Sequence, residues 1–268
     1  MLSVVIPTKF ERNNLEYCIK SIKRQTLKPK EILIVTTSHN TENINEIEQK
    51  YNVRVYIEER NGLSYSRNSG IMNTEGDIIA FIDDDAIAHK KWLYYLSKMH
   101  EIINVGICGG KIEPIWPKNV PNIIKNSTLA KEWLSLLDLA KIPIYVDRVI
   151  GCNFSLKREV FTTIGEFNTS IGNYSNLMYG GEETEFCERA GEKFKIVYCP
   201  KAIVYHEISV EKLKLNWFIK RSHDSGFLKA KMKRKPRIMT NNPRFNFFDY
   251  ILLFPYLLGY IRARITKF

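Results

Sequence analysis

The stretch that decides the fold is Gly76-Asp77-Ile78-Ile79-Ala80-Phe81-Ile82-Asp83-Asp84-Asp85. A short apolar run between a glycine and an acidic cluster is typical of a buried strand. The three adjacent carboxylates repel one another unless water or a cation screens them, which disfavours a buried structural role. One interpretation is a solvated acidic turn, and the other is a divalent-cation site. We favour the cation site because hard oxygen ligands at a strand end suit Mg²⁺ or Mn²⁺ bound together with substrate phosphates.

The first half of the chain alternates apolar strands with amphipathic helices. We predict strands at residues 2–6, 31–36, 53–57 and 77–82, and helices at 13–26, 42–50 and 63–74. This alternation is typical of α/β proteins in which a mostly parallel sheet is flanked by helices. Ligands of such sheets bind beyond the carboxyl ends of the strands, so the stretch Pro7-Thr8-Lys9-Phe10-Glu11 after the first strand joins the three aspartates as a candidate binding region.

The second half of the chain is less regular. We predict strands at residues 106–113, 150–156, 194–198 and 202–206, and helices at 127–139 and 184–190. The run Gly180-Gly181-Glu182-Glu183-Thr184-Glu185 leads into the last of these helices. Carboxylates at a helix start stabilise its positive end, so this acidic run has a structural interpretation beside any functional one.

The charge of the chain is divided unevenly. The whole sequence carries a net charge of +11, whereas residues 212–268 have 14 basic and 2 acidic residues and residues 1–211 have 26 basic and 27 acidic ones. A hydrophobic fraction of 44% excludes intrinsic disorder as the main state. We therefore predict a domain at 1–211, whose nucleotide-binding half is 1–113 and whose second half is 114–211, and a basic amphipathic helical extension at 212–268.

The extension contains the longest uncharged apolar run, Tyr250 to Ile261. At about 1.5 Å rise per residue this run is roughly 18 Å long, against roughly 30 Å for the hydrocarbon core of a bilayer. It is interrupted by Pro255 and flanked by arginines. We predict that it lies on a membrane surface. A nucleic-acid partner is not expected, because the basic cluster at 229–237 runs into this apolar segment and lacks interleaved stacking aromatics.

The cysteines and the first residues bear on the location of the protein. The five cysteines are odd in number and widely spaced, without a C-x-x-C pair. This pattern fits reduced thiols in a cytosolic protein. The chain starts with an apolar strand that is too short for a signal-peptide core and has no basic leader. We therefore expect a cytoplasmic protein that is peripheral at the cytoplasmic face of the membrane.

Several motifs, taken together, resemble the inverting family 2 glycosyltransferases, which have the GT-A fold. The motifs cover residues 2–206 in the family's order; they are Val4-Val5-Ile6-Pro7-Thr8 with Glu11, Gly62-Leu63-Ser64-Tyr65-Ser66-Arg67-Asn68 with Gly70, residues 76–85, Gly151-Cys152-Asn153 with Lys157-Arg158, Gly165-Glu166-Phe167, Gly181-Glu182-Glu183-Thr184-Glu185 and residues 200–206. The resemblance implies a GT-A fold and a hexosyltransferase type of enzyme that uses a nucleotide-sugar and a DxD motif in glycan biosynthesis. It also makes 114–211 the acceptor half.

The resemblance assigns the metal and the diphosphate. Asp83 and Asp85 look like the family's metal-binding D-x-D, with Mn²⁺ or Mg²⁺ as the cofactor, and His206 is similar to a third metal ligand. A structural histidine is the alternative for His206. Arg67 is similar to the family arginine near the diphosphate, and its alternative is a helix-surface arginine in an ion pair.

The resemblance also assigns the nucleotide-sugar site. Pro7, Thr8 and Glu11 resemble residues that line the base and ribose pocket, and Asp83 and Asp84 are placed with them. At the end of the second strand this sequence departs from the family, since Val35-Thr36-Thr37-Ser38-His39 stands where relatives carry acidic residues. Whether the donor is UDP-linked or GDP-linked therefore stays open.

A second departure concerns the catalytic base. Many relatives have Glu-Asp where this chain has Glu182-Glu183. We predict Glu183 as the general base in preference to Glu182, since a carboxylate one methylene longer still reaches an acceptor hydroxyl if the backbone sits back slightly. Trp133 is either a sugar-stacking face of the acceptor cleft or a core residue.

The predicted function is metal-dependent, inverting transfer of one sugar from a nucleotide-diphosphate donor to a glycan or lipid-linked acceptor. The Q-x-x-R-W motif of processive relatives is absent, and Trp217 and Arg221 look like part of the helix that closes the site in single-addition enzymes. Two alternatives stay open, namely a sugar-phosphate nucleotidyltransferase and a non-catalytic protein that binds membranes or nucleic acid. The first lacks its usual glycine-rich loop after the first strand.

Overall fold

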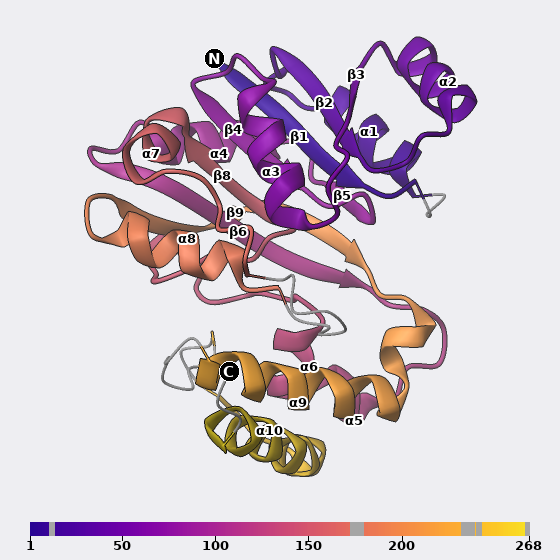
Figure 1. Ribbon diagram of the computed structural model, residues 1–268, viewed down its shortest axis with the longest axis vertical. Helices are drawn as coiled ribbons and strands as arrows, with labels where there is room; N and C mark the ends of the chain where they lie inside the picture. The colour runs from indigo at the N-terminus through magenta and orange to yellow at the C-terminus, as the bar shows by residue number, and fades with distance from the viewer. Residues whose placement is uncertain (11–13, 172–179, 232–238, 240–242, 266–268) are drawn as a thin grey trace.

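The structure is a computed structural model that describes residues 1–10, 14–171, 180–231, 239 and 243–265. Among these residues nine strands form one sheet, in the order β3-β2-β1-β4-β8-β6-β9-β5 with β7 paired to β9. Helices cover both faces of the sheet, and a further group of helices lies beyond the β6–β9 part of it (Figure 1). The expected α/β architecture is confirmed.

The first half forms a four-stranded parallel part of the sheet. Its strands are β1 (Leu2–Thr8), β2 (Glu31–Thr36), β3 (Arg54–Ile57) and β4 (Ile78–Ile82), and its helices are α1 (Leu15–Lys23), α2 (Thr41–Tyr51) and α3 (Leu63–Met72). β1 pairs in parallel with β2 and β4, and β2 with β3. The predicted strands and helices of this half are all present, with ends that differ by a few residues.

Alternating side chains of β1 build a core on each face of the sheet. Val4 and Ile6 pack with residues of α1 and of α4 (Trp92–His100). Val5 faces the opposite way and packs with residues of α3, α7 (Arg158–Ile164) and α8 (Glu182–Gly191). Two covered faces explain why these strands read as continuous apolar runs. All five cysteines are buried free thiols.

The second half adds strands of both directions. They are β5 (Ala86–Ala88), β6 (Val105–Ile115), β7 (Ile144–Tyr145), β8 (Asn153–Lys157) and β9 (Lys195–Glu207). β8 runs antiparallel to β4 and β6, and β6 runs parallel to β9. The two strands predicted at 194–198 and 202–206 are one strand, which was not expected. The register passes from Gly110–Cys199 to Lys111–Ile203, so a bulge holds the residues around Pro200 without ending the strand.

The helix predicted at 127–139 is shorter in the structure. It is α6 (Thr128–Trp133), which follows α5 (Asn122–Lys125). Ser135 has a φ of 60°, a left-handed conformation that stops the helix. The chain then runs beside β6, where the Ile112 N–H donates to the Leu137 carbonyl at 2.9 Å. Apolar spacing alone did not reveal this turn.

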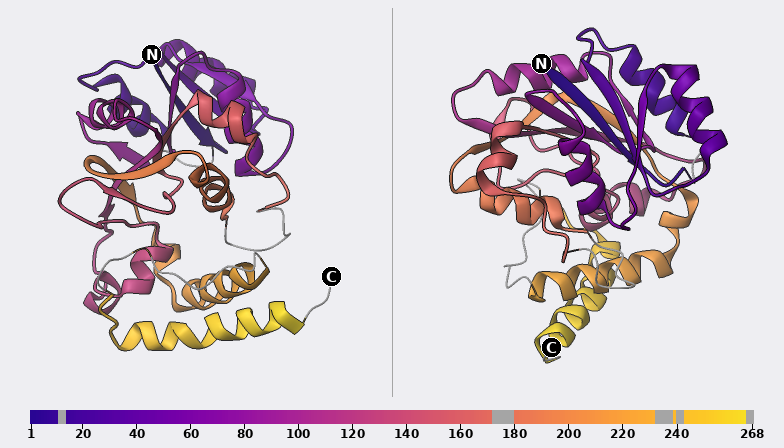
Figure 2. Two further views of the ribbon diagram at one scale, coloured as in Figure 1. Left: turned by 90° about the vertical axis from the view of Figure 1, so that its left-hand side faces the viewer. Right: turned by 45° about the horizontal axis from the view of Figure 1, so that its top comes forward.

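The C-terminal helices pack on the second half of the chain. A 3-10 turn (Val210–Leu213) leads into α9 (Leu215–Lys231), and α10 (Phe247–Ile265) lies against α9 (Figure 2). Phe218 and Leu252 share a third core with Trp133 and Leu134. No helix in the described part of the chain is long and apolar enough to cross a membrane.

Candidate functional site

The carboxyl ends of β1 and β4 open into a cavity that we call the acidic pocket. It encloses about 1050 Å³, part of it open to solvent. The residues that line it are Pro7, Thr8, Lys9, Thr37, Asn61, Gly62, Leu63, Ser66, Asp83, Asp84, Asp85, Ser135, His206 and Lys212. The structure therefore brings together the two candidates at the end of β1, the three aspartates after β4 and the histidine of β9.

Asp85 and His206 meet at the inner end of this pocket. The register of β5 and β9 pairs Ala86 with His206, and the Glu207 N–H donates to the Asp85 carbonyl at 2.9 Å. As a result Asp85 Oδ2 lies 3.3 Å from His206 Nε2 and 3.8 Å from Lys212 Nζ. Asp85 is 5% exposed and His206 is 3% exposed. A buried carboxylate is therefore surrounded by basic groups.

The other ring nitrogen of His206 fixes its orientation. His206 Nδ1 lies 3.2 Å from the Leu134 carbonyl oxygen. A carbonyl only accepts hydrogen bonds, so Nδ1 carries the proton and Nε2 points toward Asp85. Metal-binding histidines commonly have this arrangement, in which a backbone carbonyl holds one ring nitrogen and the other is left for the metal.

The acidic pocket contains the kinds of donor atom that a divalent cation binds. Asp83, Asp85 and His206 supply carboxylate oxygens and an imidazole nitrogen facing one cavity. Within the described residues, no three His, Cys, Asp or Glu side chains lie close enough together to form a metal site by themselves. Mg²⁺ and Mn²⁺ suit a site of one or two carboxylates that also takes oxygens from a bound phosphate.

The remaining aspartate is held by the end of β1. The Thr8 hydroxyl donates to Asp84 Oδ2 at 2.6 Å and accepts from the Phe10 N–H at 3.0 Å. These two bonds fix the loop after β1 against the loop after β4. Glu11, the third candidate of the β1 loop, lies outside the described residues.

A second group of charged side chains lies at the start of α8. Arg67 is 2% exposed, and its Nη1 lies 2.5 Å from Glu182 Oε1 and 3.9 Å from Glu183 Oε2. The guanidinium also lies over the rings of Phe154 and Phe167. Arg67 is thus fully buried beneath the two glutamates and does not line the acidic pocket. Its predicted contact with a diphosphate stays a prediction.

Glu183 is the glutamate that faces open space. Its side chain keeps 19% exposure, against 3% for that of Glu182. Its Oε2 atom is buried and has no hydrogen-bond partner among the described residues. Burial, and then the negative charge of Glu182, raise the pKa of Glu183 to about 7 despite the opposing effect of Arg67. A carboxylate with such a pKa can accept a proton near neutral pH.

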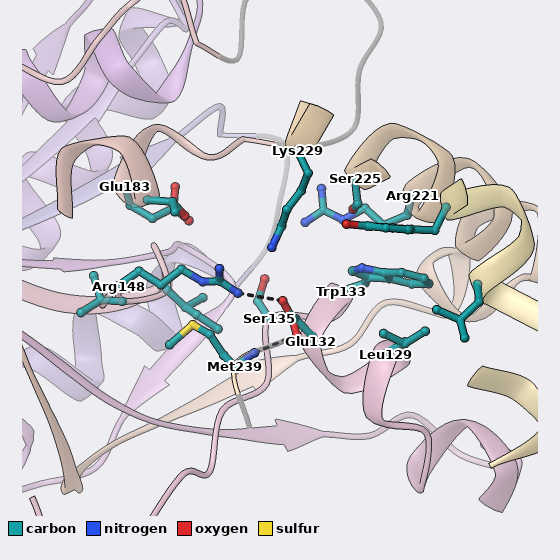
Figure 3. Close-up of a pocket in the computed structure, with 15 residues that line it drawn as sticks. Leu129, Glu132, Trp133, Ser135, Arg148, Glu183, Arg221, Ser225, Lys229 and Met239 are labelled. Carbon is teal, nitrogen blue, oxygen red and sulfur yellow. Dashed lines mark hydrogen bonds and ion pairs between the residues drawn. The ribbon is translucent and has the colours of Figure 1, made fainter. Parts of the chain in front are cut away.

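Glu183 lines a second cavity, which we call the α9 pocket (Figure 3). It encloses about 810 Å³, part of it open to solvent. The residues that line it are Leu129, Glu132, Trp133, Ser135, Arg148, Val149, Ile150, Glu183, Thr184, Arg221, Ser225, Lys229, Met239, Leu253 and Tyr256. Ser135 lines both pockets, so the aspartates and Glu183 belong to two adjoining cavities.

Some residues of the two pockets carried no signal in the sequence. Lys212 lines the acidic pocket although it is the first residue of the predicted extension. Arg148 lines the α9 pocket and forms a 2.9 Å ion pair with Glu132. Trp133 is part of the third core and also lines that pocket, so its sugar-stacking role stays a prediction. Lysine and arginine are too common for such positions to be picked out before the fold is known.

Comparison with curated proteins finds relatives over most of the chain. The chain is 28% identical to a glucosyl-dolichyl phosphate glucuronosyltransferase of Haloferax volcanii over 86% of this chain and 77% of that protein. It is 24% identical to a Methanococcus voltae protein over 95% of this chain and 78% of that protein. That protein is a dolichyl N-acetyl-glucosaminyl phosphate glucuronosyltransferase that transfers a diacetamido-dideoxy-glucuronosyl group.

Comparison with solved structures and family models agrees with these relatives. The crystal structure of GalNAc-T7 with UDP, GalNAc and Mn²⁺ matches with a TM-score of 0.63 and 17% identity, over 87% of this chain and 50% of that one, which shows a shared fold. The model of the family described as glycosyl transferase family 2 matches residues 3–165. The chain therefore belongs to glycosyl transferase family 2 and is a glycosyltransferase with a GT-A-like fold.

Proposed function

We propose that this glycosyltransferase moves one sugar from a nucleotide-diphosphate donor to a lipid-linked acceptor, with a divalent cation and with inversion at the anomeric carbon. The observation that carries the proposal is the contact between the two pockets at Ser135. One pocket holds the aspartates that would bind a divalent cation together with the donor diphosphate. The other presents Glu183, which is suited to deprotonate an acceptor hydroxyl. Direct displacement requires donor and acceptor to meet in line at such a boundary.

The reaction is a single displacement. Glu183 takes the proton of the acceptor hydroxyl, whose oxygen forms a bond to the anomeric carbon of the donor sugar. The bond from that carbon to the diphosphate oxygen breaks, and its electron pair leaves with the diphosphate. Attack from the face opposite the leaving group inverts the configuration. Glu182 is assigned a supporting role, because its carboxylate is already bound by Arg67 at 2.5 Å.

The proposed donor site is the acidic pocket. Asp83, Asp85 and His206 would hold Mn²⁺ or Mg²⁺, which when bound stabilises negative charge on the leaving diphosphate. Lys212, 3.8 Å from Asp85, adds a positive charge from the chain itself. Pro7, Thr8 and Asp84 are placed to contact the nucleotide-sugar, and Glu11 is proposed with them from the sequence. The base of the donor is left to experiment, with UDP and GDP as the candidates.

The proposed acceptor is lipid-linked, and two features support this choice. The relatives named above from Haloferax volcanii and Methanococcus voltae both carry dolichyl phosphate acceptors in their names. α10 also exposes a row of large apolar side chains, which are Phe247, Tyr250, Ile251, Phe254, Leu257, Leu258, Ile261 and Ile265. We call this row the α10 outer face.

The α10 outer face fits a membrane surface. Arg262 and Arg264 lie in the last turn of the same helix, where they suit anionic headgroups. An amphipathic helix with apolar residues on one side and basic residues beside them lies in the plane of the interface. We propose peripheral attachment through this face, because an acceptor anchored in lipid is reached only at the membrane surface. We propose the cytoplasmic side from the reduced cysteines.

The experiment that tests the proposed function is a donor panel. UDP- and GDP-linked sugars are scored by thermal stabilisation with Mn²⁺ or with EDTA, because a bound ligand raises the melting temperature. We expect the sugars of one nucleotide to stabilise the protein with Mn²⁺ but not with EDTA. Asp85→Asn is expected to remove this stabilisation. Proton NMR of the transferred sugar is expected to show inversion. Stabilisation that is identical in EDTA, or a product with retained configuration, would contradict the proposal.

A further inference from the structure

One face of α9 presents three polar side chains to the α9 pocket. Arg221, Ser225 and Lys229 are spaced four residues apart, which places them one above another on a helix, and all three line the cavity (Figure 3). We call them the α9 stripe. A guanidinium, a hydroxyl and an ammonium group on one surface are the groups with which proteins bind phosphate.

Two side chains of the α9 stripe are buried, and that of Arg221 is half-buried. Lys229 is 8% exposed and Ser225 is 2% exposed. The Ser225 hydroxyl has no hydrogen-bond partner among the described residues, although buried hydroxyls are normally bonded. A buried hydroxyl without a bond, on the wall of a cavity, indicates a ligand that supplies an acceptor atom.

The α9 pocket changes character from one end to the other. Glu183 and Arg148 lie at one end, and Lys229 reaches into the middle (Figure 3). Trp133 and Leu129 lie toward the other end (Figure 3), where Leu253 and Tyr256 of α10 also line the cavity. Along the pocket Lys229 therefore lies between the end with Glu183 and Arg148, where Glu132 pairs with Arg148 at 2.9 Å, and the apolar wall.

The apolar wall is the inner side of the helix whose outer face is exposed. α9 and α10 touch through their backbones, since a Cβ on Gly226 would lie 2.0 Å from the Tyr256 carbonyl oxygen and a Cβ on Gly259 would lie 1.9 Å from the His223 carbonyl oxygen. The Ser222 hydroxyl also donates to the Leu252 carbonyl at 2.5 Å. This tight crossing fixes the stripe relative to the apolar wall and to the α10 outer face.

We propose that the α9 stripe binds the phosphate of a sugar-phospho-lipid acceptor. The inference rests on the proposed function and adds the orientation of the acceptor. Its sugar hydroxyl lies toward Glu183, its phosphate lies against Arg221, Ser225 and Lys229, and its lipid chain follows Trp133 and α10 toward the membrane. In such a molecule the phosphate lies between the sugar and the lipid, as Lys229 lies between Glu183 and the apolar wall in the pocket.

The donor diphosphate is the other possible source of a phosphate. The acidic pocket already contains Lys9 and Lys212 beside its aspartates, and none of the three stripe residues lines it. The stripe lies instead in the cavity of Glu183, the proposed acceptor base. The acceptor phosphate is therefore the better match, and the experiment separates the two sources.

The test compares octyl phosphate with octanol by isothermal titration calorimetry on the full chain, and measures UDP and GDP binding with Mn²⁺ in parallel. We expect octyl phosphate to bind more tightly than octanol, and Lys229→Met to weaken octyl phosphate by about tenfold or more, equivalent to about 1.4 kcal/mol. Ser225→Ala, which changes little else, is expected to weaken it by roughly threefold. Lys220→Met removes an exposed charge of the same helix outside the pocket and is expected to change neither affinity.

Three results would overturn the inference. They are equal binding of octyl phosphate and octanol, unchanged octyl phosphate affinity in both Lys229→Met and Ser225→Ala, and an equal loss of nucleotide affinity in those variants. The last result would assign the stripe to the donor. Failure of the wild-type protein to bind either nucleotide would instead contradict the proposed function, so the two failures are distinguishable. Melting temperatures establish that each variant is folded.

Discussion

Replacing Arg67 by methionine tests the buried charge cluster at the start of α8. In the native protein Arg67 and Glu182 are each 2% exposed, and their charged atoms are 2.5 Å apart. The substitution keeps most of the apolar volume of the side chain. It removes the cation that contacts both Glu182 and Glu183. Breaking a buried pair from one side costs about 3–5 kcal/mol, because the remaining charge stays buried without a partner.

The expected loss is large enough to measure without a substrate. A destabilisation of that size lowers the melting temperature by roughly 6 °C or more in a protein of this size class. The double variant Arg67→Met, Glu182→Gln removes both charges and is expected to recover most of the loss. Lys98→Met is the control, because it breaks an ion pair with Glu101 in which the two side chains are 48% and 59% exposed. It is expected to cost below about 1 kcal/mol.

The assay is urea unfolding at pH 7.5 of the wild type, the two single variants and the double variant. The reasoning is refuted if Arg67→Met costs no more than Lys98→Met. It is also refuted if the double variant is no more stable than Arg67→Met, because the cost would then come from lost packing against Phe154 and Phe167 and not from an uncompensated charge.

Three further predictions address the chemistry and the location. The base must be ionised to accept a proton, so a Glu183 pKa of about 7 predicts that kcat/KM rises by roughly tenfold between pH 6 and pH 8. Glu182→Gln removes a neighbouring negative charge and is expected to move the midpoint of this pH profile to lower pH. A flat pH profile in the wild type would argue against Glu183 as the base. Asp85→Asn is expected to abolish Mn²⁺ binding measured by electron paramagnetic resonance in the presence of the donor nucleotide, and retained binding would exclude Asp85 as a ligand. Phe254→Glu, at a side chain that is 67% exposed, is expected to weaken binding to anionic vesicles by about fivefold with an unchanged melting temperature, and unchanged vesicle binding would remove the α10 outer face from the membrane proposal.

The sequence was most informative where function and local structure share the same residues. The aspartates after β4 could be located because an apolar strand followed by carboxylates is unusual, and the resemblance added His206. The pairing of Ala86 with His206 explains why residues so far apart in sequence meet. β5 itself is too short to be read from periodicity. The family assignment and the fold were therefore predictable.

Other parts depend on long-range packing and could not be predicted. Arg67 is buried against the rings of Phe154 and Phe167 and beside Glu182, all distant in sequence, and a helix pattern does not encode such contacts. Ser135 ends α6 through a left-handed conformation that its residue type does not favour, and it lies where the two pockets join. Net charge separated residues 212–268 from the rest, yet Phe218 and Leu252 share a core with Trp133. Charge patterns report solvation and not packing.

The α9 stripe shows a signal that was visible but had no context. Arg221, Ser225 and Lys229 have helical spacing in the sequence. Arg221 was placed in a helix that closes the site, and Lys229 counted only as part of the basic extension. The structure turns this face inward, toward the cavity of Glu183. A periodic polar pattern acquires meaning once the side of the helix that faces the core is known.

The most direct test of the two-pocket account is a crystal structure of the protein with Mn²⁺, the donor nucleotide found in the panel, and octyl phosphate. The account predicts the nucleotide diphosphate in the acidic pocket, with the cation between it and Asp85, and the octyl phosphate headgroup against Lys229. A diphosphate bound to Arg221 and Lys229 in the α9 pocket, with the acidic pocket empty, would contradict it.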